Sequence, residues 1–399
     1  MKVRAVTVGL GLSWPLPSEA IERACDVCLL VKRRVEARGI EVQTTRLCGG
    51  SIDKMLDPQH AQELPEVARR LAESVRAEGV DYCSLGVVQA DARTGLVEPY
   101  VDGLTDALGL GLGVFGSVQA ATTRWGVNPR ALRRSAALVK RLATVAPDGS
   151  ANRHFCVSAN VPPNGAFFPS AYHRGPRPHL AFALEAADVA VRAFQDTPSA
   201  ETGAASLTKA LTREARPLER IGLASCEMAG MAYSGIDVSL APFPSDDISI
   251  GAAIEALGGG VLGSPGALAA VAAITGALRR VKLRTCGFSG VMLPVLEDSV
   301  LTRRNTEGRL DLDKLLLYSA VCGTGLDTIP LPGDVTEEQL TAILLDVCTL
   351  AVRLDKPLTA RLMPIPGKRA GDLASFEFPF FAANRVMAVP DRPLSRLLA

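Results

Sequence analysis

Short apolar runs alternate with longer amphipathic runs along the first part of the chain. Residues 2–10 and 80–88 are short and mostly apolar, as is typical of strands. Residues 17–39 and 64–79 place apolar side chains every three or four positions, which predicts helices. With a further strand predicted over 40–47, the order is β-α-β-α-β, and this alternation favours a mostly parallel sheet.

The pattern changes in the middle of the chain. Residues 152–179 begin like a strand and then carry five prolines, so we expect a long, packed loop there. Helices are predicted over 179–194 and 202–225, and two more over 266–281 and 336–352. The second part of the chain therefore continues as strand, loop and helix units.

No low-complexity linker divides the 399 residues, so we expect one compact α/β body over 1–399, with a soft boundary between lobes 1–150 and 151–399. The 43 Lys and Arg residues balance 42 Asp and Glu, which favours small-molecule partners or a homo-oligomer over nucleic acid or an anionic membrane. No apolar run reaches the ~18–20 uncharged residues of a membrane helix. Nine scattered cysteines without a secretion signal favour reduced thiols and a cytoplasmic location.

Three later segments repeat one frame: residues 234–247, 324–334 and 359–368 each resemble a strand that runs into Pro-x-Pro. Because a shift of two residues keeps a side chain on the same face of a strand, the polar residue before the prolines shares one face in all three. Strand-to-helix loops of a parallel sheet or barrel converge on one rim. The residues predicted at that rim are Asp237, Asp327 and Arg361 before the prolines, and Asp246, Asp334 and Lys368 after them.

Carboxylates and basic residues would meet at this rim. We expect Asp237, Asp327 and Asp334 to bind a divalent metal such as Mg²⁺, Ca²⁺ or Mn²⁺, or Asp237 and Asp327 to act as acid and base. Arg361 and Lys368 would hold a carboxylate or phosphate of the substrate. For Asp334, as for the aspartate after the first frame, the alternative is a helix N-cap without a role in binding.

Other residues are candidates for catalysis or binding. Cys322 precedes a glycine in a turn and is a candidate nucleophile, or else a buried small apolar side chain. His173, in the proline-rich loop, is a candidate general acid. Glu297 and Asp298 are adjacent and would face opposite ways on a strand, so we expect Glu297 alone to enter the site. Ser289 is a candidate substrate-binding residue, although its segment lacks the second glycine of a nucleophile elbow.

Five motifs follow one another along the chain: SGIDVSLAPFPSDD, GSPGALAAVAAITGAL, GFSGVMLPVLEDS, VCGTGLDTIPLPGD and RLMPIPGKRAGD. They resemble those of the family called DUF711 or UPF0210, and the resemblance covers essentially the whole chain. It implies the ten-stranded α/β barrel of pyruvate formate-lyase-like glycyl radical enzymes, with helices outside. Those enzymes carry their radical glycine in an Arg-Val-x-Gly-Tyr motif, but Ala388 stands at the matching position here, so no glycyl radical is expected.

The function expected from these features is a non-redox enzyme of the hydrolase, lyase, isomerase or cyclase type. It would act on an anionic small molecule at a carboxylate-rich barrel rim, where a divalent metal fits the oxygen ligands. No P-loop and no GxGxxG after the first strand is present, so no nucleotide cofactor is expected. Two alternatives stay open: covalent catalysis by Cys322, and a non-catalytic metabolite-binding or regulatory protein.

Overall fold

The computed structural model describes residues 1–91, 97–195 and 197–389, and its centre is a mostly parallel sheet of ten strands. This large sheet makes the protein a mixed α/β fold, as the sequence predicts. A small antiparallel pair, β11 (Leu373–Ala374) and β12 (Asn384–Arg385), lies apart from it. The strands of the large sheet are β1 (Lys2–Gly9), β2 (Thr45–Cys48), β3 (Tyr82–Gln89), β4 (Phe115–Thr122), β5 (Gly126–Val127), β6 (Phe155–Ala159), β7 (His179–Glu185), β8 (Ala232–Ala241), β9 (Gly325–Pro332) and β10 (Leu358–Ile365).

The order of the strands is β8-β7-β1-β2-β3-β4-β6-β10-β9, with the short β5 paired to β4. Strands β1, β2, β3, β4 and β6 run parallel to one another. The outer pairs β7–β8 and β9–β10 are each parallel within the pair but antiparallel to the neighbouring central strand. Because β1 pairs with β7 and β4 pairs with β6, the sheet joins the lobes 1–150 and 151–399.

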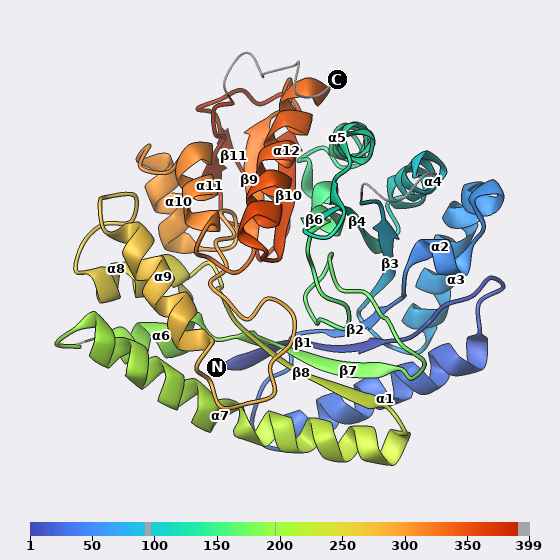
Figure 1. The fold of residues 1–399 in the computed structure, drawn as a ribbon, viewed down its shortest axis with the longest axis horizontal. Coiled ribbons are helices and arrows are strands. Elements are labelled where there is room, and N and C mark those ends of the chain that lie inside the picture. Colours follow the sequence, from blue (N-terminus) through green and yellow to red (C-terminus); the bar gives the residue numbers. More distant parts are fainter. Residues whose placement is uncertain (92–96, 196, 390–399) are drawn as a thin grey trace.

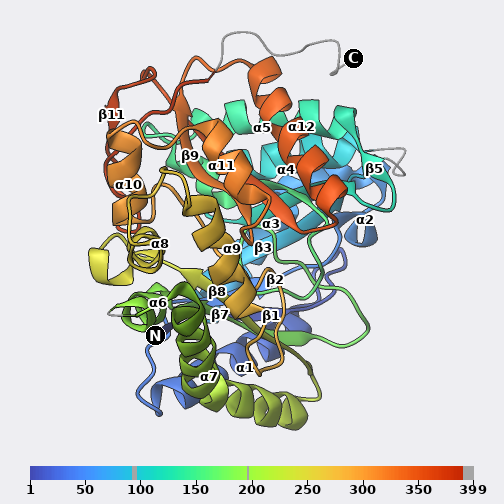
Figure 2. The same cartoon turned by 60° about the vertical axis from the view of Figure 1, so that its left-hand side comes forward.

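Helices surround this sheet on the outside (Figure 1). The longest helix, α7, runs alongside α1, where Arg34 Nη1 donates a hydrogen bond to Ser225 Oγ over 2.9 Å (Figure 2). The α-helices are α1 (Ser18–Glu36), α2 (Ile52–Met55), α3 (Leu64–Ala77), α4 (Glu98–Gly109), α5 (Pro129–Ala143), α6 (Ala187–Phe194), α7 (Ala200–Ala229), α8 (Ile250–Gly258), α9 (Ala267–Leu278), α10 (Ser299–Thr306), α11 (Leu312–Ser319) and α12 (Glu337–Leu354). Three 3₁₀ turns cover Pro58–Glu63, Ser150–His154 and Asp246–Ile248.

Local sequence signals account for several of these helices. In α3, the buried residues Leu64, Val67, Leu71 and Val75 recur every three or four positions and face the core. Helix α12 begins with a capping box, in which Thr336 and Gln339 satisfy each other's backbone N–H groups. In the part of the chain that is described, no helix is long and apolar enough to cross a bilayer.

One predicted element is wrong. Residues 179–194 are not one helix, since they form the strand β7 followed by the helix α6. All seven residues of β7 are buried, so the strand lacks the apolar–polar alternation of a half-exposed strand. A continuous apolar run of this kind cannot be told from a buried helix by its pattern alone. The strand predicted over 40–47 is shorter than expected, because β2 covers only Thr45–Cys48.

The hydrogen-bonded strands do not close into a ring. The path ends at β8 on one side and at β9 on the other. An irregular segment, residues 285–296, touches both edges through single parallel bridges, Ile236 with Thr285 and Pro294 with Asp327. The barrel implied by the family resemblance therefore stays a prediction, while the large parallel sheet is established.

Candidate functional site

A cavity of about 90 Å³ lies among side chains of β1, β2, β3, β6, β9 and β10. One ordered water needs roughly 10–15 Å³ on the same scale, so the space suits a small ligand. The wall combines charged groups with many aromatic rings. Its lining residues include Arg4, Arg46, Arg153, Arg361, Glu297, Asp327, Cys156, Thr324, Thr359, Tyr82, Phe115, Phe167, Phe168, Phe288, Met292, Phe378 and Phe380.

A chain of ion pairs crosses one wall of this cavity. Arg361 Nε donates to Asp327 Oδ1 over 2.6 Å, and Arg361 Nη2 donates to Glu297 Oε1 over 2.9 Å. The other oxygen of Glu297 accepts from Arg4 Nη2 over 2.8 Å. Arg4 Nη1 in turn lies 3.2 Å from Glu185 Oε2, behind the wall. Arginines and carboxylates therefore alternate from Asp327 to Glu185.

A bulge in β9 sets up this chain. Leu326 pairs with Ala360 and Ile329 pairs with Leu362, so β9 places two residues, Asp327 and Thr328, opposite one residue of β10. Thr328 adopts a left-handed φ of 46°, which is unusual for a β-branched residue. That single opposing residue is Arg361. The backbone carbonyl of Asp327 also accepts from Val295 N over 3.0 Å, which brings the nearby Glu297 to the same place.

The charge state of Arg361 follows from the geometry of these ion pairs. Burial alone would lower the pKa of Arg361, but Asp327 and Glu297 together raise it above the usual range of a guanidinium. Burial raises the pKa of Glu185, and Arg4 opposes that rise only in part. The guanidinium between the two cavity carboxylates is therefore held firmly as a cation.

Arg46 has no such carboxylate. Its side chain is buried, and within the described part of the protein that side chain makes one hydrogen bond, from Nε to Thr44 Oγ1 over 3.0 Å. The guanidinium carbon lies 5.2 Å from the Phe168 ring centroid and 5.8 Å from that of Tyr82. Among the described residues no carboxylate is within ion-pair distance. Burial, with the neighbouring cation of Arg4, lowers the pKa of Arg46 to about 9.

Aromatic residues from a C-terminal segment cover two more arginines. Arg153 lies 5.0 Å from the ring centroid of Phe378, and Arg4 lies 4.5 Å from that of Phe380. Burial lowers the pKa of Arg153, and no carboxylate of the described chain pairs with it. The two phenylalanines belong to the segment 375–383, which is pinned at its base where β11 pairs with β12. The N–H groups of both guanidiniums are partly used by the protein, because Arg4 donates to Glu297 and Glu185 and Arg153 Nη1 donates to Ser150 O over 3.0 Å.

The charge balance of the cavity favours an anion. Four lining arginines against the two lining carboxylates, Glu297 and Asp327, leave a surplus of two positive charges. Counting Glu185, which contacts Arg4 from outside, reduces the surplus to one. A buried cation without a counter-ion is costly unless a ligand supplies the missing charge. The guanidinium fork suits a carboxylate or a phosphate.

Comparisons with known sequences agree with the resemblance. Residues 1–377 match the family described as "Uncharacterised ACR (DUF711)". The chain belongs to the DUF711 family. It is 34% identical over 348 residues to a "UPF0210 protein" of Pyrobaculum arsenaticum, covering 84% of this chain and 76% of that protein. Similar relatives are a "UPF0210 protein PAE3581" of Pyrobaculum aerophilum, at 33% identity over 86% and 78% of the two chains, and a "UPF0210 protein" of Desulforudis audaxviator, at 29% over 94% and 88%.

In this DUF711 protein, three residues predicted from sequence meet in the cavity. Asp327, Glu297 and Arg361 contact one another as described above. Asp298, the neighbour of Glu297, points elsewhere: it is fully buried, caps α10, and accepts hydrogen bonds from the start of α8. The choice of Glu297 over Asp298 therefore matches the placement of the two side chains.

Asp237 and Ser289 do not line the cavity. The carboxylate of Asp237 is fully buried and accepts from Ser239, from Phe288 N and from Ser289 N. The Ser289 hydroxyl donates to Cys286 O over 2.8 Å and accepts from Val238 N of β8 over 3.4 Å. Both side chains therefore fasten the segment 285–296 to β8. Burial raises the pKa of Asp237 in spite of these hydrogen bonds.

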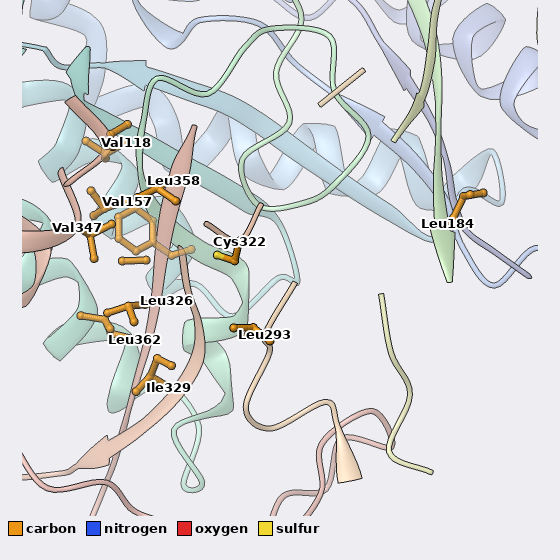
Figure 3. Packing of buried hydrophobic residues seen from close by; sticks show 14 of the residues in the cluster. Val118, Val157, Leu184, Leu293, Cys322, Leu326, Ile329, Val347, Leu358 and Leu362 are labelled. Atoms are coloured by element: carbon orange, nitrogen blue, oxygen red, sulfur yellow. The ribbon is translucent and has the colours of Figure 1, made fainter. Parts of the chain in front are cut away.

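Cys322 and His173 also lie outside the cavity lining. Cys322 is 1% exposed and shares an apolar cluster with residues such as Val157 and Leu358, as Figure 3 shows. Its buried position agrees with the alternative of a small apolar side chain. His173 is buried in the long loop, where Nδ1 lies 3.0 Å from Nδ1 of His179 and Nε2 donates to Gly175 O over 2.9 Å.

The remaining rim residues are dispersed. Asp334 is exposed and Lys368 is half-buried, and neither lines the cavity. Neither Asp334 nor Asp246 is a helix N-cap, because α12 is capped by Thr336 and α8 by Ser249. Within the described residues, no three His, Cys, Asp or Glu side chains are grouped to hold a metal ion. The predicted metal set Asp237, Asp327 and Asp334 therefore does not form one cluster in this structure.

Sequence reasoning missed Arg4, Arg46 and Arg153. Arg4 and Arg46 each stand inside an apolar strand, where a charged residue is costly without a function or a partner. That is the same signal that pointed to Asp327, and it applies equally to these two arginines. Arg153 lies in a short 3₁₀ turn, and no sequence pattern distinguishes it from a surface arginine.

Proposed function

We propose that this DUF711 protein binds a small organic anion in the arginine-lined cavity and acts on it without redox chemistry. The observation that carries the proposal is Arg46, a buried guanidinium without a carboxylate partner in the described chain. No acceptor among the described residues pairs with its Nη groups, so they are available to a carboxylate or phosphate. Aromatic side chains around it, such as Phe168 and Tyr82, would exclude water and strengthen that pairing.

Glu297 and Asp327 are the groups best placed for proton transfer in such an enzyme. Both line the cavity and both are fixed by Arg361, which would hold them in position beside a bound anion. A carboxylate base of this kind would serve a hydrolase, lyase, isomerase or cyclase reaction.

A non-catalytic binding protein is the second candidate. It is favoured by the same ion pairs, because Arg4 and Arg361 already occupy oxygens of both carboxylates. Turnover of a bound anion would separate the two candidates, whereas binding alone fits both. Covalent catalysis by Cys322 has less support, since that thiol is buried away from the cavity lining.

A barrel-like enclosure of the cavity is part of the proposal. The segment 285–296 touches β8 and β9 and also supplies Phe288, Met292 and Pro294 to the cavity wall. It would take the place of the strand that closes a barrel between the two edge strands, β8 and β9. A divalent metal, a homo-oligomer and a cytoplasmic location stay predictions beside it.

The test measures anion binding by the wild-type protein and by Arg46→Met. The measurement is calorimetric titration with inorganic phosphate, benzoate and lactate. We expect at least one probe to bind, and Arg46→Met to weaken it by about tenfold or more, since charge-assisted hydrogen bonds contribute ~1.5–3 kcal/mol. Removing an unpaired buried cation should leave the free energy of unfolding equal or higher.

The matched control is Arg124→Met. Arg124 also stacks on an aromatic ring, 4.8 Å from the Trp125 centroid, but it is exposed and outside the cavity. Its substitution should leave anion binding unchanged. Equal binding by wild type and Arg46→Met would contradict the proposal.

A further inference from the structure

One cavity residue has a hydroxyl that no protein group uses. Among the described residues, seven buried side-chain polar atoms lack a hydrogen-bond partner, and only Thr324 Oγ1 belongs to a residue that lines the cavity. Thr324 is 1% exposed, so bulk water does not compensate for the missing bond. A buried hydroxyl without a partner costs stability, and such a group in a native protein needs an explanation.

The position of Thr324 is fixed by its neighbours. Its carbonyl accepts from Thr359 N over 2.6 Å and from Thr359 Oγ1 over 3.0 Å, immediately before β9 begins. The hydroxyl of Thr359 is therefore already used by the protein. Both oxygens of Glu297 and Oδ1 of Asp327 are likewise engaged by arginines. Among the described residues of the cavity lining, Thr324 Oγ1 is thus the one fully buried side-chain polar atom without a protein partner.

We propose that Thr324 is a specificity residue that hydrogen-bonds a neutral hydroxyl or carbonyl group of the bound anion. The ligand class is an organic acid that carries such a group on an apolar body. Its acid group would pair with Arg46, so this inference rests on the proposed function. The apolar body would lie against side chains of the cavity wall such as Phe288 and Met292.

The decisive variant is Thr324→Val, which removes the hydroxyl and keeps the shape of the side chain. The probes are matched pairs of acids that differ by one hydroxyl: benzoate with 4-hydroxybenzoate, and propionate with lactate. In the wild type, the hydroxylated member of at least one pair should bind more tightly. Thr324→Val should lower that preference by about five- to tenfold, the range of one net hydrogen bond, and leave binding of the parent acid unchanged.

Stability gives a second readout. Because the hydroxyl has no protein partner, the melting temperature of Thr324→Val should equal or exceed that of the wild type. The matched control is Ser135→Ala, which removes another buried and unpartnered hydroxyl, on α5 and outside the cavity lining. That control should not change either binding constant of a pair.

The outcomes separate this inference from the proposed function. If Arg46→Met abolishes binding while Thr324→Val keeps the wild-type preference, the role of Thr324 is wrong and the anion site stands. If the wild type binds no probe, or Arg46→Met binds as well as the wild type, both proposals are wrong. A melting temperature of Thr324→Val well below that of the wild type would mean that the hydroxyl serves the fold, and would also overturn its role.

Discussion

Asp237 and Asp327 occupy matching places in two related sequence frames, yet their surroundings in the structure are opposite. Asp237, on β8, is enclosed by backbone N–H groups of the segment 285–296 and by Ser239. Asp327, on β9, faces the cavity and pairs with Arg361. The two carboxylates lie on the two edge strands of the sheet. The same pattern therefore gives a structural anchor at one edge and a site residue at the other.

The backbone of the neighbouring segment explains the difference. Gly287 and Ser289 both have positive φ angles, 60° and 44°, and the turn they make directs N–H groups at the carboxylate of Asp237. A Cβ on Gly287 would lie 2.1 Å from Asp237 Oδ2, so only glycine permits this close approach. Asp327 meets no such turn. Its charge is balanced instead by a side chain that also reaches the cavity.

The largest loss of stability is expected from Arg361→Ala, which removes the partner of Asp327. The substitution leaves the buried carboxylates of Asp327 and Glu297 without this partner. Removing one member of a buried ion pair costs about 3–5 kcal/mol. Urea unfolding at pH 7 should show a loss of that size. A loss below about 1 kcal/mol would mean that the network is not a closed set of ion pairs.

A smaller effect is expected from Asp237→Asn at the other edge. The amide keeps one oxygen for Ser239 and Ser289 but places an NH₂ group against Phe288 N, which then loses its acceptor. The free energy of unfolding should fall by about 1–3 kcal/mol, the cost of one buried unsatisfied donor. Anion binding should stay at the wild-type level. Loss of binding in a variant that melts like the wild type would place Asp237 in the site after all.

The pH dependence sharpens the contrast at the β7–β8 edge, where His179 is fully buried on β7. Burial lowers the pKa of His179 to about 3, so between pH 6.5 and 3 the unfolded chain binds a proton that the folded chain does not. Stability should therefore fall with falling pH, by up to about 1.4 kcal/mol per pH unit from this group.

His179→Gln removes that titration. The difference in unfolding free energy between wild type and His179→Gln, measured at pH 7, 6 and 5, should shrink as the pH falls. His173 also has its pKa lowered by burial, so the double variant with His173→Gln should flatten the slope further. A difference that is constant with pH would contradict the buried, neutral imidazole pair.

The smallest effect is expected from Cys322→Ala. The thiol lies in the apolar cluster near the β9 frame, and its loss removes one small buried group, at a cost of about 1 kcal/mol. Anion binding and any turnover should be unchanged. Complete loss of turnover with normal stability would instead favour Cys322 as a nucleophile. Intact-mass labelling of the folded protein with iodoacetamide checks the burial of the thiol independently.

The sequence indicated more of the fold than of the site. The alternation of apolar and amphipathic runs predicted the mostly parallel sheet. The strand β7 was missed because it is buried on both faces, so its continuous apolar sequence was taken for part of a helix. For the site, Asp327 and Glu297 were visible because charges inside apolar runs demand partners, and Arg361 was visible because it holds the matching place in a repeated frame. Arg153 was not visible, since its place at the cavity depends on the contact with Phe378, some 225 residues away in sequence.

By itself, the sequence determined the α/β class, the DUF711 membership and the three frames that carry Asp237, Asp327 and Arg361. Local patterns suffice for these, because strand and helix periodicity and short motifs act within about ten to twenty residues. Only the tertiary structure decided which polar groups are paired with other protein groups and which remain available to a ligand. That depends on partners from distant segments: backbone N–H groups for Asp237, Arg361 for Asp327, and no carboxylate among the described residues for Arg46.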